Sequence, residues 1–287
     1  MLTALRLLLP ALILASAVPA AAGGVHDRIY PAPTEPLTIA GLPAGAKLVT
    51  VLTRDNLTLT GIAVAPTAGM PTLLVFHGNA SSAAGTIAWF APLIARGYGI
   101  LAAEYRGYSG NPGKPNEAGL FADAKAFFDL GRTMAGEGRL WVVGHSLGAG
   151  VAMGLAGRER LDALVTIGAF TRLRAMAPKL ARAFVPDAYD NLAMVPKLDE
   201  RWLILHGTGD TAVPWQQGEA LHKAASAAGR TGASFVLLGA DHKPDGKLLA
   251  AVFESTGTFL RTGEHSAAGL PANTKLIPFG RSAPLNP

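Results

Sequence analysis

The chain has 287 residues, of which 49% are hydrophobic, 16% are charged and none is cysteine. Without cysteine, disulfides, thiolate metal sites and a thiol nucleophile are excluded. The formal net charge of +5 comes from scattered Lys and Arg and does not indicate a nucleic-acid-binding protein. This length and hydrophobicity are typical of one α/β domain with its own core.

Residues 1–22 have the pattern of a secretory signal peptide. Arg6 supplies a positive charge, Leu7–Val18 are apolar, and Ala20-Ala21-Ala22 offers a cleavage site of small residues. The apolar stretch is about 12 residues long and contains Pro10, whereas a membrane-spanning helix needs about 20 residues. We therefore expect an exported protein, periplasmic or secreted. Retention of the segment as an N-terminal anchor is the alternative.

Residues 23–46 are rich in proline and carry little periodicity, which favours an extended arm. Two apolar segments follow, Lys47–Thr53 and Leu57–Val64, separated by the polar turn Arg54-Asp55-Asn56. Hydrophobic residues alternate in the second segment. This pattern predicts an antiparallel hairpin with one face in solvent.

From residue 72 onward, apolar strands alternate with helical patterns, which predicts a mostly parallel sheet with helices on both faces. The predicted strands are Thr72–His77, Tyr98–Glu104, Arg139–Gly144, Leu161–Ile167, Trp202–His206 and Ser234–Leu238. The predicted helices are Ala83–Arg96, Glu117–Met134, Leu147–Arg158, Gln216–Ala228 and Lys247–Leu260. With the hairpin, this makes one eight-stranded domain over residues 47–262. Residues 263–287 show no pattern and are predicted to form a loose tail.

The turn Gly144-His145-Ser146-Leu147-Gly148 joins a predicted strand to a predicted helix and has the form G-x-S-x-G. A serine on such a corner sits in strained backbone, and the flanking glycines let the chain fold past itself. The pentapeptide alone is weak evidence, because a glycine-rich turn can contain an incidental serine. Its position between a strand and a helix makes a nucleophile the stronger interpretation.

Ligands of parallel α/β sheets bind at the carboxyl ends of the strands, and residues suited to catalysis follow those ends here. A serine nucleophile needs a histidine base, which in turn needs a carboxylate. Ser146, Asp210 and His242 supply these groups in the order nucleophile, acid, histidine. The competing candidates are His77, His145 and His206 for the base, interpreted as supporting residues, and Asp187, Asp190 and Asp241 for the acid.

These residues resemble the α/β-hydrolase superfamily, in particular compact single-domain members related to monoglyceride lipases and serine aminopeptidase-type hydrolases. The resemblance covers about residues 47–261 and implies the α/β-hydrolase fold. It implies an oxyanion hole formed by the backbone N–H groups of Leu147 and Asn79. It rests on Phe76-His77-Gly78-Asn79, Tyr105-Arg106-Gly107-Tyr108-Ser109-Gly110, the serine turn, Leu205-His206-Gly207-Thr208-Gly209-Asp210 with Val213-Pro214, and Asp241-His242.

In this family, substrate specificity usually comes from an insertion that corresponds here to residues 170–201. Its length of about 30 residues excludes a large cap domain. The segment predicts a helix with an apolar stripe and a basic stripe, either an ordinary surface helix or a lid that contacts membrane lipid or anionic substrates. The apolar stripe is Leu173, Met176, Ala177, Leu180 and Phe184, and the basic one is Arg172, Arg174, Lys179 and Arg182.

The sequence thus predicts an exported serine hydrolase that cleaves small-molecule carboxylic esters with small to medium apolar acyl groups. It indicates no metal and no cofactor. Hydrolysis of amides or thioesters by the same residues stays open, as do a non-catalytic ligand-binding member of the fold and cofactor-free peroxidation. Arg106 has two interpretations, a binding group for a substrate carboxylate or phosphate and an anchor for its own loop. The oligomeric state is not predicted.

Overall fold

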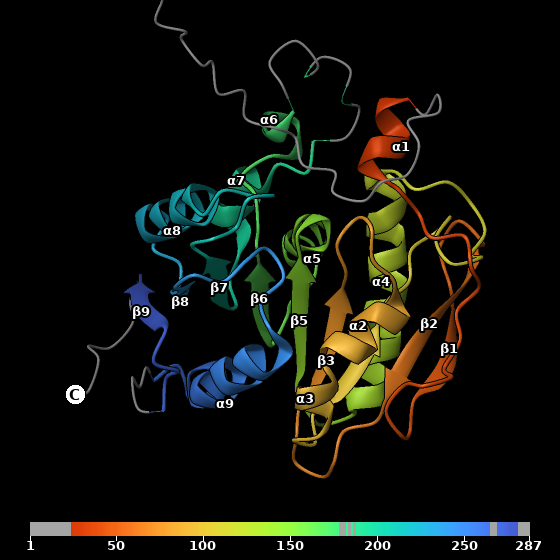
Figure 1. Ribbon diagram of the computed structural model, residues 1–287, viewed down its shortest axis with the longest axis horizontal. Helices are drawn as coiled ribbons and strands as arrows, with labels where there is room; N and C mark the ends of the chain where they lie inside the picture. Colours follow the sequence, from red (N-terminus) through yellow and green to blue (C-terminus); the bar gives the residue numbers. More distant parts are fainter. Residues whose placement is uncertain (1–23, 178–181, 183–184, 186–187, 265–268, 281–287) are drawn as a thin grey trace, which may run out of the picture.

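The computed structural model describes residues 24–177, 182, 185, 188–264 and 269–280. Its nine described strands form one sheet in the order β1-β2-β4-β3-β5-β6-β7-β8-β9 (Figure 1). The strands are β1 (Lys47–Leu52), β2 (Thr58–Val64), β3 (Thr72–Phe76), β4 (Gly99–Ala102), β5 (Leu140–His145), β6 (Ala163–Ile167), β7 (Arg201–Gly207), β8 (Gly232–Leu237) and β9 (Thr274–Phe279). The pairs from β3 to β8 are parallel, and β1 and β2 form the predicted antiparallel hairpin.

Helices cover both faces of this sheet, as predicted. The longer helices are α2 (Ala83–Trp89), α4 (Glu117–Ala135), α5 (Leu147–Ala156), α8 (Gln216–Ala227) and α9 (Gly246–Thr262). The short ones are α1 (Val25–Ile29), α3 (Ala91–Ile94), α6 (Leu173–Met176) and α7 (Asn191–Met194). Apolar residues of α4, α5 and α8 belong to one core cluster, and those of α2, α3 and α9 to the other.

The strand β3 shows why the central strands are continuously apolar. Leu74 and Phe76 belong to the cluster under α4 and α5, whereas Leu73 and Val75 belong to the cluster under α2 and α9. Successive side chains of a strand point to opposite faces, so a strand covered by helices on both sides has no polar face. The sheet is therefore a fixed platform whose carboxyl edge can carry a site.

The prediction of eight strands and a loose tail is wrong for residues 274–279. They form β9, which pairs antiparallel with β8 from Gly232↔Phe279 to Leu237↔Thr274. Pro278 weakened the strand pattern in the sequence, but proline is tolerated on an edge strand, where it breaks no central ladder. Phe279 is buried and its ring centroid lies 5.9 Å from that of Trp202, which attaches the segment to the core.

The predicted extended arm contains the short helix α1 and is attached to the domain. Tyr30 is buried, and its hydroxyl lies 3.0 Å from the hydroxyl of Tyr189. The backbone N–H of Ser109 donates to the carbonyl of Pro33 at 2.7 Å. The expected signal peptide lies outside the described residues. Within them, no helix has both the length and the apolarity needed to cross a membrane.

Candidate active site

The serine turn has the strained geometry that its sequence predicts. Ser146 has φ 54° and ψ −118°, a left-handed conformation that is rare for residues other than glycine. A Cβ on Gly144 would lie 2.3 Å from the carbonyl oxygen of Gly148, and a Cβ on Gly148 would lie 2.1 Å from that of Phe76. These distances leave room for glycine alone. The turn presents a half-buried serine at the carboxyl end of β5.

Asp210 and His242 lie together after the ends of β7 and β8. The Nδ1 atom of His242 is 2.8 Å from Oδ2 of Asp210, whose side chain is fully buried. Oδ1 of Asp210 accepts from the backbone N–H groups of Ala212 at 3.0 Å and Val213 at 2.7 Å. A carboxylate only accepts, so Nδ1 carries the ring proton and Nε2 is left as a base.

The electrostatics of Asp210 favour its charged form. Burial alone would raise the pKa of this carboxyl, but hydrogen bonds from His206 and His242 outweigh it and hold the pKa below its usual range. A carboxylate that stays ionised can fix the orientation of the His242 ring and stabilise its cation.

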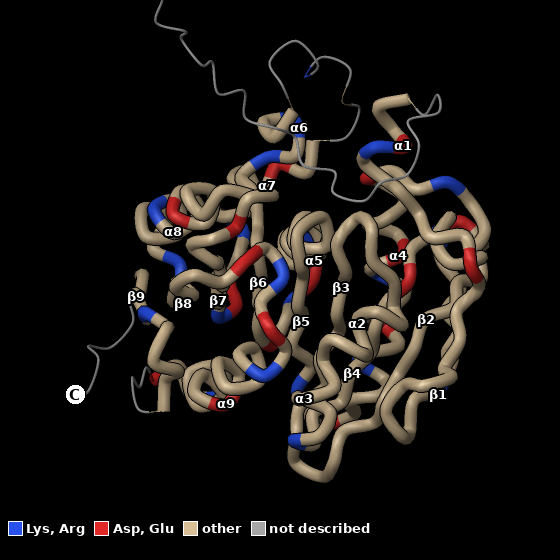
Figure 2. Tube along the Cα trace, in the orientation of Figure 1, with Lys and Arg blue, Asp and Glu red and all other residues tan. Residues whose placement is uncertain are grey.

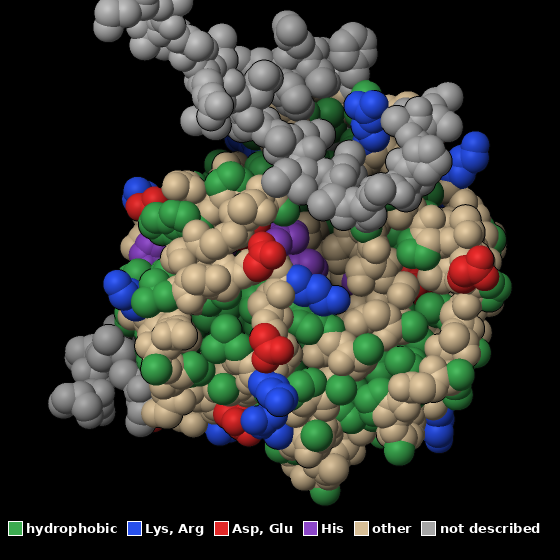
Figure 3. Space-filling model, viewed as in Figure 1, with side chains coloured by type: hydrophobic (Ala, Val, Ile, Leu, Met, Phe, Trp, Pro, Cys, Tyr) green, Lys and Arg blue, Asp and Glu red, His purple; other side chains and the backbone are tan. Residues whose placement is uncertain are grey.

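Contacts made by residues adjacent in sequence to Ser146 and to Ile167 bring Ser146 and His242 close together. His145, which precedes the serine, donates from Nε2 to the backbone carbonyl of His242 at 3.0 Å, and the two rings lie 4.8 Å apart. The N–H of Ser146 donates to the carbonyl of Ile167, and a Cβ on the next residue, Gly168, would lie 3.0 Å from the His242 ring. Histidine side chains are visible in a hollow of this face (Figure 3).

The hydroxyl of Ser146 forms no hydrogen bond within the described part of the chain. Bonds between a nucleophile and its base are often long or poorly aligned without substrate and tighten when substrate binds. The missing bond is therefore compatible with Ser146 as a candidate nucleophile and His242 as its candidate base.

The two residues expected to form the oxyanion hole flank the serine. Leu147 is the first residue of α5, so its N–H has no partner within the helix. Asn79 follows Gly78, where a Cβ would lie 3.3 Å from Cβ of Ser146. The loop of Gly78 and Asn79 thus passes directly beside Ser146.

A buried pair that sequence reasoning did not identify holds this loop. Nε2 of His77 lies 2.7 Å from Oε1 of Glu104, and its Nδ1 lies 2.8 Å from the carbonyl oxygen of Gly78. The hydroxyl of Tyr105 donates to the carbonyl of His77 at 2.8 Å. Glu104 was detectable as an acidic residue ending a predicted apolar strand, a position where a buried charge needs a partner.

Arg106 anchors its own loop, which is the second of its two interpretations. Its guanidinium pairs with the buried Asp123 at 2.7 Å and with both carboxylate oxygens of Asp55 at 2.7 and 3.0 Å. The hydrogen bond from Arg106 also lowers the pKa of the Asp55 carboxyl well below its usual range. The Arg106 side chain is only 7% exposed, so its donors serve the fold.

Segment 170–201 does not form the predicted amphipathic helix in its described part. The helix α6 ends at Met176, and Ala177 is extended with ψ 149°. Proline at 178 disfavours helical backbone in the residue before it. Of the arginines, Arg172 pairs with Asp190, while Arg174 and Arg182 donate to backbone carbonyls of the same segment. Lys179, Leu180 and Phe184 lie outside the described residues.

The competing acids have other partners. Asp190 caps α7 by accepting from the N–H of Ala193 at 3.0 Å. Asp241 accepts from the backbone N–H of His242 at 2.7 Å, so it holds the main chain rather than the ring. Asp187 lies outside the described residues. Asp210 is thus the carboxylate that the structure brings to the His242 ring.

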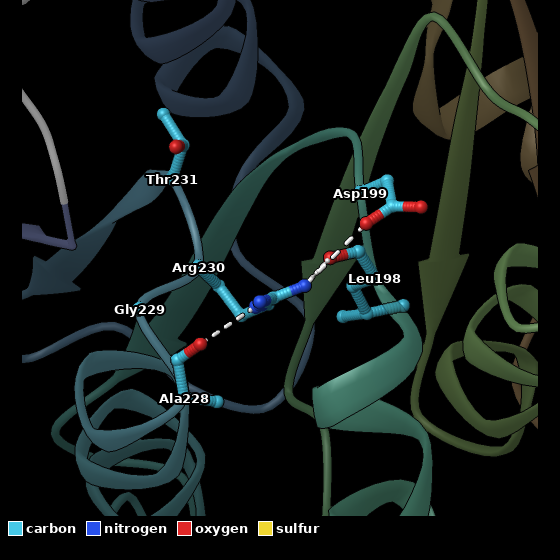
Figure 4. A pocket seen from close by; sticks show the side chains of 6 residues that line it. All are labelled: Leu198, Asp199, Ala228, Gly229, Arg230 and Thr231. Atoms are coloured by element: carbon cyan, nitrogen blue, oxygen red, sulfur yellow. Dashed lines mark hydrogen bonds and ion pairs between the residues drawn. The ribbon is translucent and has the colours of Figure 1, made fainter.

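A surface hollow of about 390 Å³ lies elsewhere, between Leu198-Asp199 and Ala228–Thr231 (Figure 4). It sits at the amino ends of β7 and β8, the opposite edge of the sheet from Ser146. Arg230 lines it and donates to the carbonyls of Leu198 and Ala228. Lys and Arg are interspersed with Asp and Glu along the chain (Figure 2). Within the described residues, no group of three His, Cys, Asp or Glu could hold a metal ion.

Comparisons with known proteins agree with this fold. A family model described as alpha/beta hydrolase fold matches residues 71–193. An uncharacterized protein of Mycobacterium tuberculosis is 36% identical over 194 residues, which make up 64% of this chain and 69% of that protein.

Two further matches differ in what they share with this chain. Lysophosphatidylserine lipase ABHD12 of Bos taurus is 30% identical over 181 residues, 54% of this chain and 46% of the lipase, so the chain spans just under half of that protein. The esterase Pf2001 of Pyrococcus furiosus superposes with a TM-score of 0.63 at 22% identity, covering 80% of this chain and 97% of the esterase. At 22% identity, this match shows that the two proteins share a fold and nothing more.

Proposed function

We propose that the chain, which belongs to the α/β-hydrolase family, is a serine hydrolase that cleaves carboxylic esters. In this proposal Ser146 is the nucleophile, His242 the general base and Asp210 the acid that orients it. The observation that carries it is the 2.8 Å contact between His242 Nδ1 and Asp210 Oδ2, next to a serine with φ 54°.

The chemistry follows from these positions. Nε2 of His242 takes the proton of the Ser146 hydroxyl as the oxygen attacks the ester carbonyl. The carbonyl oxygen becomes negative and is stabilised by the N–H groups of Leu147 and Asn79, each worth about 3 to 4 kcal/mol. The tetrahedral intermediate collapses, His242 gives the proton to the leaving alkoxide, and an acyl-Ser146 ester remains. Water, activated by His242, then hydrolyses that ester and restores the serine.

The proposed substrates are small-molecule esters with small to medium apolar acyl groups, since the insertion at 170–201 is too short for a cap domain. Amide or thioester cleavage by the same three residues is the related alternative. The export of the protein and its organisation as one domain over residues 47–262, with an arm at 23–46, are also part of the proposal.

A second candidate is an ester with an anionic headgroup, the kind of substrate in the name of the lysophosphatidylserine lipase relative. Lys243 favours it, because this lysine follows His242 and its Nζ lies 5.2 Å from the Trp89 ring centroid. Burial lowers the pKa of Lys243, and no carboxylate within the described chain pairs with it. A desolvated ammonium beside the base would attract a phosphate or carboxylate.

The test combines a label with a substrate panel. A fluorophosphonate should label the wild-type chain at Ser146, and Ser146→Ala should lose ester turnover by about four orders of magnitude or more while keeping its fold. Retained turnover in that variant would end the proposal. Nitrophenyl esters of graded chain length, beside aminoacyl anilides, separate ester from amide preference. Lys243→Gln should impair turnover of a lysophospholipid but not of nitrophenyl butyrate if the second candidate holds.

A further inference from the structure

A second imidazole contacts the carboxylate of Asp210. His206 lies in β7, one residue before its end, and its Nε2 is 3.2 Å from Oδ2 of Asp210, the oxygen that also bonds His242. The same nitrogen lies 2.8 Å from the carbonyl oxygen of Val213. The His206 side chain is 5% exposed. One carboxylate oxygen is therefore shared between two histidine rings.

The surroundings fix the protonation of His206. Both neighbours of Nε2 are oxygen acceptors, so this nitrogen carries a proton. Nδ1 is buried and has no hydrogen-bond partner among the described residues. It faces α8 at Gly218, where a Cβ would lie 2.5 Å from it. A proton on Nδ1 would be a buried donor without an acceptor, which is unfavourable. The neighbours of the ring thus place the His206 proton on Nε2.

The remaining contacts of Asp210 show what His206 does. Oδ1 is held by two backbone N–H groups, those of Ala212 and Val213, which position the carboxylate without any histidine. The Nε2–H group of His206, which donates to the Val213 carbonyl, also lies 3.2 Å from Oδ2 and draws on part of the negative charge that this oxygen offers to His242. His206 therefore acts on the strength of the bond between Asp210 and His242 more than on the place of Asp210.

We infer that His206 acts through Asp210: it limits how strongly this carboxylate stabilises the protonated His242 ring, and so sets the lower end of the pH range in which His242 is a base. The inference rests on the proposed function, in which His242 is the general base. A weaker hold on the proton keeps His242 in its basic form at lower pH.

The other charged and titratable groups around His242 come from two elements. At the end of β5, His145 contacts the ring; burial, together with the charge of His242, lowers the pKa of His145 to about 3, which leaves it neutral above that pH. From the loop before α9, Asp241 bonds the His242 backbone and Lys243 lies over Trp89. None of these groups changes when His206 is replaced.

The experiment replaces His206 with Leu, which removes the donor, and with Gln, whose amide N–H takes the place of Nε2–H. The pH profile of kcat/KM with nitrophenyl acetate is one readout, and NMR titration of the His242 ring, which needs no substrate, is the other. We expect His206→Leu to move the midpoint of the acid limb, and of the ring titration, upward by about half a pH unit to one unit. His206→Gln should keep the wild-type midpoint.

If His206 has a purely structural role, His206→Leu will turn over ester more slowly without a change in either midpoint, and that result would overturn the inference. A downward shift of the midpoints in His206→Leu, or an equal upward shift in His206→Gln, would overturn it as well. If the ring titration shifts as expected but the wild type turns over no ester, the proposed function fails and the inference about the ring stands. If His206→Leu does not fold, nitrogen NMR of the wild type tests the inference instead. A proton on Nδ1 of His206, rather than on Nε2, would overturn it.

Discussion

Glu200 should make the protein less stable as pH rises through neutrality. This residue precedes β7, is 9% exposed, and has no partner for its Oε1 among the described residues. Its Oε2 accepts only a 3.3 Å bond from the N–H of Asp199. Burial, with a smaller contribution from the charge of Asp199, raises the pKa of Glu200 from its usual 4.5 to about 7.

The direction of this pH effect follows from the number of protons that Glu200 binds in the folded and unfolded states. Between pH 4.5 and 7 the folded state holds the Glu200 proton and the unfolded state has lost it, so rising pH favours unfolding. At 1.36 kcal/mol per pKa unit the full effect is about 3 kcal/mol, and about 2 kcal/mol of it falls between pH 5 and pH 8. Below pH 4.5 both states are protonated and the full stabilisation by the neutral carboxyl is present.

Glu200→Gln removes this titration and keeps the shape of the neutral side chain. Urea unfolding at pH 5 and pH 8 should show the variant gaining about 2 kcal/mol over the wild type between the two pH values. The matched control is Asp199→Asn, the preceding residue, whose side chain is 88% exposed; it should keep most of the pH dependence, because the charge of Asp199 contributes less than burial to the pKa of Glu200. Equal pH dependence of Glu200→Gln and the wild type would refute the reasoning, and ester turnover at pH 7 serves as a check that the distant site is intact.

Three further changes test other parts of the structure. Gly148→Ala places a Cβ 2.1 Å from the carbonyl oxygen of Phe76 and should lower the free energy of unfolding in urea by about 3 kcal/mol or more. The control Gly24→Ala, whose Cβ would have nothing within 4 Å, should change that free energy by less than about 0.5 kcal/mol. Similar losses in the two variants would contradict close packing at Gly148. Burial holds the pKa of His145 at about 3, so between pH 7 and pH 4 the unfolded state gains a proton that the folded state does not bind. Over this range the wild type should lose about 3 kcal/mol of unfolding free energy relative to His145→Gln. The same pH dependence of unfolding in the two proteins would refute this. The last change replaces Arg172, Arg174 and Arg182 of the insertion by Gln. If the segment contacts lipid, this variant should lose activity on anionic-lipid vesicles and keep its activity on a small soluble ester. Equal loss of activity on both substrates would reject that role.

The sequence predicted the alternating core well because its strands are apolar on both faces and its helices on one. It could not predict β9, since an edge strand with Pro278 lacks the alternation that identifies strands and depends on the pairing offered by β8. It also placed one helical stripe from Leu173 to Phe184, whereas α6 ends at Met176 and Ala177 is extended before proline 178. Both errors concern segments whose conformation depends on a local proline or a distant partner.

The choice of base shows what the structure adds at the site. Four histidines follow strand ends, and sequence order alone favours one of them. In His77 both ring nitrogens contact oxygen acceptors, in His145 the ring is buried and bonded to a carbonyl, and in His206 one nitrogen is bonded and the other enclosed. His242 is 20% exposed and uses Nδ1 for Asp210. Its Nε2 has no partner among the described residues and its ring is the most exposed of the four, which favours it as the proposed base. Burial and hydrogen-bond partners together distinguish the four rings, and neither can be read from the spacing of residues.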